Sequence, residues 1–542
     1  MKITLAPNFI ISVFVCTLAT TNVFAEETIG SIIPNMPERN PWLIDSVYPT
    51  SHFNSAQTDS VTMAGPIKGR KLTAADVKIV PTVFTSNPTI KHVGDETILF
   101  ASGVNGIHKI IATGESLREV SFMPYPGSEA QAARVTPEAI GVAIAAADAA
   151  RRSMNEARIL AVSKKIEELG YKTMIHGYYN FFDKDGFHYA LFGDASIIKT
   201  TDDNDPKKPI LPLKVKNLAE GLSPEITKSI GRVFGAGMTY DGNIAVVASG
   251  ALFLVDRDLN VKDTLALPGE SICNSIAVDK TGIYVVTSKR MLKVVYTGTK
   301  LSYDDADGGW QSEYNTVSDK EAWAAGSFSR GSGTTPTLMG FGDAPDKLVI
   351  IADADKNGTN LVAFWRDQIP EGFKQKSGTK SARIADQIRI DISKVTIEVS
   401  AGVLGYGVSV NNATYPNPVR ELYGRFMTAG VTRPGPMGVQ KFTWNPKTHS
   451  FEKAWVNMEV DNTDLLVPVI SAKTNMIYVA TKVNGDYQFL GLDWSTGKVK
   501  ARWVFPDDSR VWNTICGIAI ILDDGDFLLG GYFSIKRVNV GN

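Results

Sequence analysis

Short apolar runs alternate with polar turns along most of the chain. Residues 237–248 read as two β-strands joined by a tight turn at Gly242. Residues 275–287 repeat the pattern, and their turn glycine, Gly282, follows Gly242 by 40 residues. A unit of about 40 residues built from several short strands is typical of one blade of a β-propeller.

Weaker copies of this unit occur on both sides of the clear pair. They are residues 97–112, 178–192, 348–365, 476–498 and 517–530. We therefore predict an all-β chain that forms a propeller of seven blades, or eight, over residues 26–542. An array of β-sandwiches is the alternative fold for such a pattern.

One segment breaks the β pattern. Residues 136–170 are rich in alanine, with Thr136 placed as an N-cap, Pro137 in the first turn and Gly170 as a stop signal. They predict one long helix, or two shorter ones, inserted into the propeller. This insertion either packs on the outside of a blade or forms a lid over the central channel.

The N-terminus has the features of a secretory signal peptide. Lys2 precedes an apolar stretch, residues 9–19, that is too short to span a bilayer, and Val23-Phe24-Ala25 provides a cleavage site before Glu26. No later run approaches 18 apolar residues. We expect residues 1–25 to be removed and the mature protein to be exported, to the periplasm or the extracellular space, with no transmembrane segment.

Charge and cysteine content exclude several classes of function. The 542-residue chain has 56 basic and 57 acidic residues, and this net charge of −1 does not favour nucleic acid as a partner. After the signal, only Cys273 and Cys516 remain, too few for a disulfide framework. Whether the two form a disulfide or remain separate thiols is left open by the sequence.

Two motifs resemble quinoprotein-like propeller repeat proteins. The run Tyr-Pro-Thr-Ser-His-Phe-Asn-Ser-Ala-Gln-Thr-Asp-Ser, from Tyr48 to Ser60, resembles their entry segment. The run Asp-Trp-Ser-Thr-Gly from Asp493, followed by Trp503, is similar to their Asp-x-x-Thr-Gly-x-x-x-Trp docking motif, although alanine stands at position 501. Quinone-dependent members also carry a vicinal disulfide, which this sequence lacks. The resemblance therefore implies the fold and disfavours a quinone cofactor.

A third motif resembles the propellers of the gluconolactonase, paraoxonase and strictosidine-synthase group. It runs from Asn274 to Val286 as Asn-Ser-Ile-Ala-Val-Asp-Lys-Thr-Gly-Ile-Tyr-Val-Val. In lactonases of that group, an asparagine before an innermost strand helps to bind a central calcium-type cation. The resemblance implies this role for Asn274 and, through a weaker match, for Asn513. Buried amides that bond only to the backbone are the alternative.

Three further residues are candidates for the same channel. Asp353 begins an Asp-x-Asp-x-Asn-Gly run that matches half of a calcium loop, and Glu270 lies in the loop that leads to Asn274. Either carboxylate would add charge to the oxygen ligands that calcium requires. His176, at the start of a predicted inner strand, is the best candidate for a general base.

These features support three functions. The first is a metal-dependent hydrolase of lactone or ester type, in which one calcium ion polarises a carbonyl group in the central channel. The second is a quinoprotein-like oxidoreductase, and the third is a non-catalytic binding or assembly propeller. In each case we expect a small molecule, or a fragment of a polymer, to bind in the channel.

Overall fold

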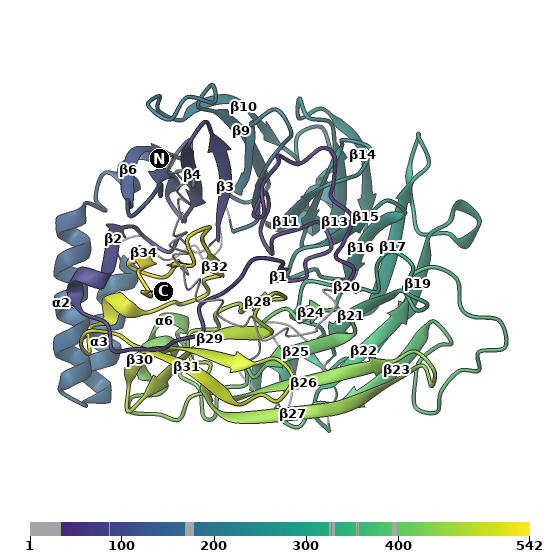
Figure 1. Cartoon of the computed structure of the whole chain (residues 1–542). Coiled ribbons are helices and arrows are strands. Elements are labelled where there is room, and N and C mark those ends of the chain that lie inside the picture. Colours follow the sequence, from purple (N-terminus) through teal and green to yellow (C-terminus); the bar gives the residue numbers. More distant parts are fainter. Residues whose placement is uncertain are drawn as a thin grey trace, which may run out of the picture. The chain divides into compact units, whose positions relative to one another are not determined.

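Eight sheets of mainly antiparallel strands form an eight-bladed β-propeller (Figure 1). This computed structural model describes residues 34–541 except 86, 169–177, 325–326, 328–330, 354, 356 and 393–397. The described residues belong to one unit, Pro34–Asn542. The predicted all-β propeller is confirmed, and the blade number is eight rather than seven.

Each blade has four strands in order from the channel outward. The innermost strands are β3 (Asn87–Val93), β7 (Asn180–Phe182), β11 (Val233–Met238), β15 (Ala277–Asp279), β20 (Thr337–Met339), β24 (Gly402–Leu404), β28 (Val469–Ser471) and β32 (Ala519–Ile521). The second strands are β4 (Glu96–Ser102), β8 (His188–Phe192), β12 (Ile244–Ala248), β16 (Gly282–Val286), β21 (Leu348–Ala352), β25 (Gly407–Asn411), β29 (Met476–Val483) and β33 (Phe527–Leu529).

The outer half of each blade completes the sheet. The third strands are β5 (Gly106–Ile111), β9 (Ser196–Thr201), β13 (Ala251–Val255), β17 (Arg290–Tyr296), β22 (Asn360–Trp365), β26 (Met437–Asn445), β30 (Asp486–Asp493) and β34 (Ser534–Val538). The outermost are β6 (Arg118–Pro124), β10 (Leu211–Asn217), β14 (Val261–Ala266), β19 (Trp310–Glu313), β23 (Ile384–Arg389), β27 (Ser450–Asp461), β31 (Val499–Val504) and β2 (Val77–Pro81); β18 (Leu301–Ser302) also pairs with β17.

Neighbouring blades cover both faces of the central strands. Every residue of β12 and β13 is buried, and their sequences, Ile-Ala-Val-Val-Ala and Ala-Leu-Phe-Leu-Val, are continuously apolar. Covered strands read as apolar runs because neither face meets water. Because of this burial, the strands could be recognised in the sequence as continuous apolar runs.

An early strand and the last described strand share one blade. Strand β2 pairs antiparallel with β34, with Val77 opposite Val538 and Pro81 opposite Ser534. In Figure 1 the two strands lie next to each other. This pairing closes the ring of blades and protects the edge of the last sheet.

The sixth blade, β24–β27, is the one that the repeat count missed. A helix, α6 (Leu422–Thr428), interrupts it between β25 and β26. Because β25 ends at Asn411 and β26 begins at Met437, the interval is much longer than the tight turns that mark the other blades.

The alanine-rich segment forms two helices, α2 (Pro137–Arg152) and α3 (Glu156–Glu168). The Thr136 side chain accepts a hydrogen bond from the Ala139 amide at 3.2 Å, which is the expected N-cap. Arg151 pairs with Asp508 and anchors α2 to a loop of the propeller. The predicted stop at Gly170 lies outside the described residues. Shorter helices are α1 (Glu129–Ala132), α4 (Pro224–Ile230) and α5 (Asp319–Ala324), with 3-10 turns η1 (Ala74–Asp76), η2 (Asp305–Asp307) and η3 (Arg510–Trp512).

Within the part of the chain that the structure describes, no helix has the length and apolar character that crossing a membrane requires.

Residues 40–61, which we call the channel segment, belong to no four-stranded blade and run along the innermost strands. They end in the short strand β1 (Ser60–Val61), which pairs parallel with β28. Hydrogen bonds connect this segment to all eight innermost strands. They run from Ile90 N to Tyr48 O (2.9 Å), Ser51 N to Asn180 O (3.2 Å), Asn40 Nδ2 to Met238 O (2.7 Å), Val278 N to Ser55 O (2.7 Å), Leu338 N to Ala56 O (3.0 Å), Val403 N to Thr58 O (2.9 Å), Ile470 N to Asp59 O (2.9 Å) and Tyr48 Oη to Ile521 O (2.7 Å).

Candidate functional site

A cavity of about 220 Å³ lies at one mouth of the central channel. Its walls come from the segments that lead into seven of the eight innermost strands, and its members include Tyr178, Tyr179, Arg232, Cys273, Asn274, Gly333, Ser400, Val467 and Cys516. Residues far apart in the sequence therefore meet here because every blade begins at the same end of the channel. Of the described residues of α2 and α3, none lines this cavity.

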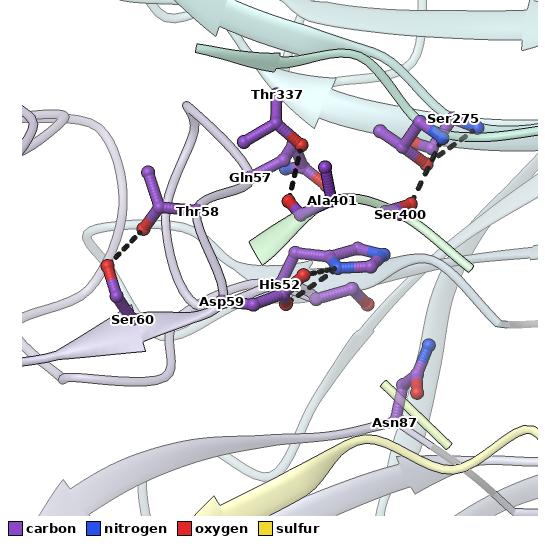
Figure 2. A network of polar contacts seen from close by, with 12 residues as sticks. His52, Gln57, Thr58, Asp59, Ser60, Asn87, Ser275, Thr337, Ser400 and Ala401 are labelled. Atoms are coloured by element: carbon purple, nitrogen blue, oxygen red, sulfur yellow. Dashed lines mark hydrogen bonds and ion pairs between the residues drawn. The ribbon is translucent and has the colours of Figure 1, made fainter. Parts of the chain in front are cut away.

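His52 of the channel segment also lines the cavity. Its Nδ1 lies 2.7 Å and 2.9 Å from the two carboxylate oxygens of Asp59, and both side chains are buried. The other ring nitrogen, Nε2, has no hydrogen-bond partner among the described residues. Figure 2 shows this nitrogen on the side of the ring that points away from Asp59.

The backbone around His52 is strained. His52, Phe53, Gln57 and Asp59 have φ values of 56°, 73°, 61° and 54°. A left-handed conformation costs a residue other than glycine roughly 1–3 kcal/mol and persists only where the surrounding structure imposes it. The hydrogen bonds to the eight blades provide that constraint. Strain of this kind concentrates at functional sites.

Tyr179 connects His52 to Asn274. Its ring stacks on the His52 ring, with 5.8 Å between the centroids. Its hydroxyl donates to the Asn274 amide oxygen and lies 3.1 Å from Thr335 Oγ1. Burial raises the pKa of Tyr179, so the hydroxyl stays protonated at neutral pH.

Asn274 is fully engaged in hydrogen bonds at the cavity wall. Besides the Tyr179 hydroxyl, its amide oxygen accepts bonds from the Ser275 amide at 2.9 Å and from Thr335 Oγ1 at 3.0 Å. Its Nδ2 donates to the Gly333 carbonyl at 2.6 Å. Asn274 therefore lies at the wall of the channel cavity, and its amide oxygen holds the Tyr179 hydroxyl in place.

Glu270 and Asp353 lie in the same half of the propeller but do not line the cavity. Arg290 Nη2 lies 2.7 Å from the Glu270 carboxylate, which also accepts from Thr287 Oγ1 at 2.6 Å. The Asp353 carboxylate accepts from the Asn360 backbone and side-chain amides, and burial raises its pKa to about 7. Each carboxylate is thus held by its own hairpin or loop.

Asn513 lies in the segment that leads into β32, three residues before Cys516 of the cavity lining. Its Nδ2 donates to the Arg510 carbonyl at 2.6 Å, and its oxygen accepts from the Tyr532 amide at 2.8 Å. It is not among the residues that line the cavity. His176 lies outside the described residues, so its proposed role as a base stays a prediction.

The described residues do not assemble an evident calcium site. They contain no group of three or more His, Cys, Asp or Glu side chains that could hold a metal ion. The Asn274 oxygen already accepts three hydrogen bonds, and Glu270 is paired with Arg290. The calcium ion stays a prediction.

Cys273 and Cys516 both line the cavity, and the two do not form a disulfide with each other. Burial raises the pKa of Cys516 to about 12, which keeps this thiol protonated at neutral pH. Cys516 also has a positive φ of 52° and lies in the turn before β32. A protonated thiol is a poor nucleophile, so Cys516 is not suited to attack a substrate in this cavity.

Sequence reasoning did not select His52 or Asp59, although both lie in the run from Tyr48 to Ser60 that carries the family resemblance. That run contains a histidine and an aspartate within eight positions of a polar stretch that fits no strand. The sequence therefore contained both residue types close together. It could not show that His52 and Asp59 form a buried pair, because only the surrounding blades bury them.

Comparison with known proteins gives distant similarities. No protein-family model matches the chain. An uncharacterised protein of Archaeoglobus fulgidus is 29% identical over 286 residues, which is 49% of this chain and 53% of that protein. The chain thus spans about half the length of the curated relative that it matches.

Solved structures with a similar arrangement are also propellers. A proposed 6-phosphogluconolactonase of Bacteroides fragilis has a TM-score of 0.38 at 11% identity, over 79% of this chain and 94% of that one. The WD40 domain of a Toxoplasma gondii coronin has a TM-score of 0.33 at 8% identity, over 89% and 90%. Similarities at this level carry no argument about function.

Proposed function

We propose that the protein is a hydrolase that cleaves a small ester or lactone in the channel-mouth cavity. The observation that carries this proposal is the buried His52–Asp59 pair: His52 lines the cavity, and its Nε2 has no hydrogen-bond partner among the described residues. A histidine oriented by a carboxylate, with its second nitrogen directed at a cavity, is the arrangement that a general base requires.

The proposed reaction needs one water molecule and no further reactant. Nε2 of His52 accepts a proton from water while the water oxygen forms a bond to the substrate carbonyl carbon. The carbon–oxygen bond to the leaving alkoxide then breaks, and the imidazolium returns the proton to that alkoxide. The products are a carboxylic acid and an alcohol, which in a lactone are parts of one hydroxy acid.

Asp59 has two tasks in this scheme. Its carboxylate accepts the Nδ1 hydrogen of His52, which leaves Nε2 with its lone pair and fixes the ring orientation. It also stabilises the imidazolium that forms during the reaction. Tyr179, stacked on the ring and held by Asn274, limits the movement of the base.

We further propose, from the N-terminal signal, that this activity is exported. A quinone-dependent oxidation is less well supported, because the alanine at position 501 and the missing vicinal cysteines depart from that pattern. A binding propeller without activity would use the same cavity, and the experiment below separates the two.

The test compares the wild type with His52→Asn on small chromogenic esters and on lactones of four to six ring atoms. We expect hydrolysis by the wild type and a decrease in kcat of about 10²–10⁴-fold in the variant, the usual contribution of a general base. The control is His92→Asn, since His92 is exposed and lies outside this cavity. Melting temperatures of all three proteins show whether each variant is folded. Equal activity of His52→Asn and the wild type, or no hydrolysis of any substrate by the wild type, would overturn the proposal.

A further inference from the structure

Arg232 brings a positive charge to the wall of the cavity, at the start of β11. We propose that the cavity selects small ligands that carry a carboxylate group and that Arg232 binds this group. The inference names the substrate class of the hydrolase proposed above and rests on it for the chemistry, but the binding itself can be measured without any reaction.

The guanidinium of Arg232 is partly removed from water. The side chain is half-buried, and its Cζ lies 4.6 Å from the centroid of the Phe234 ring. Burial lowers the pKa of Arg232, and arginine still remains charged at neutral pH. A cation with reduced hydration gains more from an anionic ligand than a fully solvated one does. The planar guanidinium of an arginine matches the two oxygens of a carboxylate better than a point charge does.

Glu398 adds a negative charge to the wall of the cavity. It precedes β24, three blades along the ring from β11, and accepts a hydrogen bond from Ser327 Oγ at 2.7 Å. Its carboxylate packs against Gly333, where a Cβ atom would lie 1.8 Å from Glu398 Oε2. The missing side chain at Gly333 therefore makes room for this negative charge. A ligand carboxylate is attracted toward Arg232 and repelled from Glu398, so it enters in one orientation.

The rest of the lining indicates the polarity and the size of the part of the ligand that lies beyond its carboxylate. Most of it is apolar, and its members include Tyr178, Phe234, Val399, Leu465 and Val467. The volume of about 220 Å³ is below the roughly 300–1,000 Å³ of cavities for drug-sized ligands. These features fit a short aliphatic chain or a single ring. With the carboxylate at Arg232, the ester or lactone group is left to face His52.

The test measures binding by calorimetry to the full-length protein. Acetate, butyrate and benzoate are each compared with the neutral amide of the same shape, namely acetamide, butyramide and benzamide. For at least one pair we expect the carboxylate to bind about 10–100-fold more tightly, which is the range for a hydrogen bond to a charged group. Arg232→Gln should remove this preference. Arg118→Gln, which removes a positive charge from an exposed position on β6, should retain it.

The outcomes separate this inference from the hydrolase proposal. His52→Asn should keep the preference for carboxylates, because His52 is not assigned to bind them. If the wild type binds carboxylates selectively but hydrolyses nothing, the hydrolase is overturned and the anion site stands. If no pair shows a preference, or Arg232→Gln retains one, the anion site is wrong even where hydrolysis depends on His52. Melting temperatures of the Arg232 and Arg118 variants check that the fold is intact.

Discussion

His52 Nδ1 lies 2.7 Å from Asp59 Oδ1, and the two residues are seven positions apart in a segment that lies inside the ring of blades. Burial raises the pKa of Asp59, while the neighbouring His52 lowers it. Neither residue could keep this geometry in an isolated peptide, because both have positive φ angles that the surrounding blades impose. The pair is thus a product of the closed propeller.

Replacement of Asp59 by asparagine tests the role of the carboxylate. An amide can donate a hydrogen to Nδ1, which would leave the hydrogen on Nε2 and remove its ability to accept a proton. We expect kcat for ester hydrolysis to fall at least about 10²-fold, with the melting temperature recorded beside it. Asp45→Asn, at a largely exposed aspartate, is the matched control. An unchanged kcat in Asp59→Asn would show that Asp59 does not orient the base.

Tyr48→Phe tests how firmly the channel segment is held. The Tyr48 hydroxyl donates to the Ile521 carbonyl at 2.7 Å and accepts from the Ile521 amide at 3.1 Å. Removing it leaves two buried backbone groups without this partner, so we expect the free energy of unfolding to fall by about 1–3 kcal/mol. Chemical denaturation measures the change, with Tyr296→Phe at a half-buried tyrosine as control. An equal decrease in the free energy of unfolding in both variants would show that the Tyr48 hydroxyl does not stabilise the channel segment.

Asn274→Ala separates a structural amide from a calcium ligand. The variant deprives the Tyr179 hydroxyl and the Gly333 carbonyl of partners, and we expect it to be less stable by about 1–3 kcal/mol. Elemental analysis of both proteins tests the cation. The calcium prediction requires about one ion per chain in the wild type and less in the variant. A wild type without calcium, combined with a loss of stability alone, would make Asn274 structural.

Asp353 should make stability depend on pH. Burial raises its pKa to about 7 from 3.8, so between these values the folded state binds a proton that the unfolded state releases. Stability from this group is therefore full below about pH 4 and is lost as the pH rises toward 7. The difference corresponds to roughly 4 kcal/mol at most.

The measurement is the unfolding midpoint of the wild type and of Asp353→Asn from pH 4.5 to 7.5. The amide is neutral throughout and resembles the protonated acid in shape. We expect the wild type to lose stability relative to the variant as the pH rises. A difference that stays constant over this range would show that Asp353 does not titrate there.

The N-terminal signal leads to a prediction about the mature protein. We expect protein isolated from its natural source to begin at Glu26 and to be found outside the cytoplasm, because Lys2 and residues 9–19 are followed by the Val23-Phe24-Ala25 cleavage site. N-terminal sequencing and cell fractionation measure this. Native protein that starts at Met1 would contradict it.

Local pattern was enough for much of the fold. The runs around Gly242 and Gly282 are strands and turns in the structure: Gly242 lies in a tight turn with a positive φ of 84°, and Gly282 is the first residue of β16, directly after a turn. The sixth blade, β24–β27, escaped detection because α6 lengthens the connection between β25 and β26. A repeat count depends on regular spacing, and an insertion removes that signal without changing how the strands pair.

The candidate site was predicted only in part. Asn274 lies on the cavity wall, as the position before an innermost strand implied, whereas Glu270 and Asp353 face partners of their own. Whether a carboxylate turns to the channel or to a neighbouring amide depends on loop conformation. The sequence around each residue does not specify that conformation.

The class of fold follows from local sequence features, because strand periodicity, turn residues and helix caps act over a few neighbouring positions. The location of the candidate site depends on how the blades pack together. It placed the run from Tyr48 to Ser60 inside the ring, buried His52 against Asp59, and brought Arg232 and Asn274 from different blades to one cavity. These relations join residues up to several hundred positions apart. They exist only once the ring of eight blades has closed around the channel segment, since the hydrogen bonds that hold that segment come from every blade.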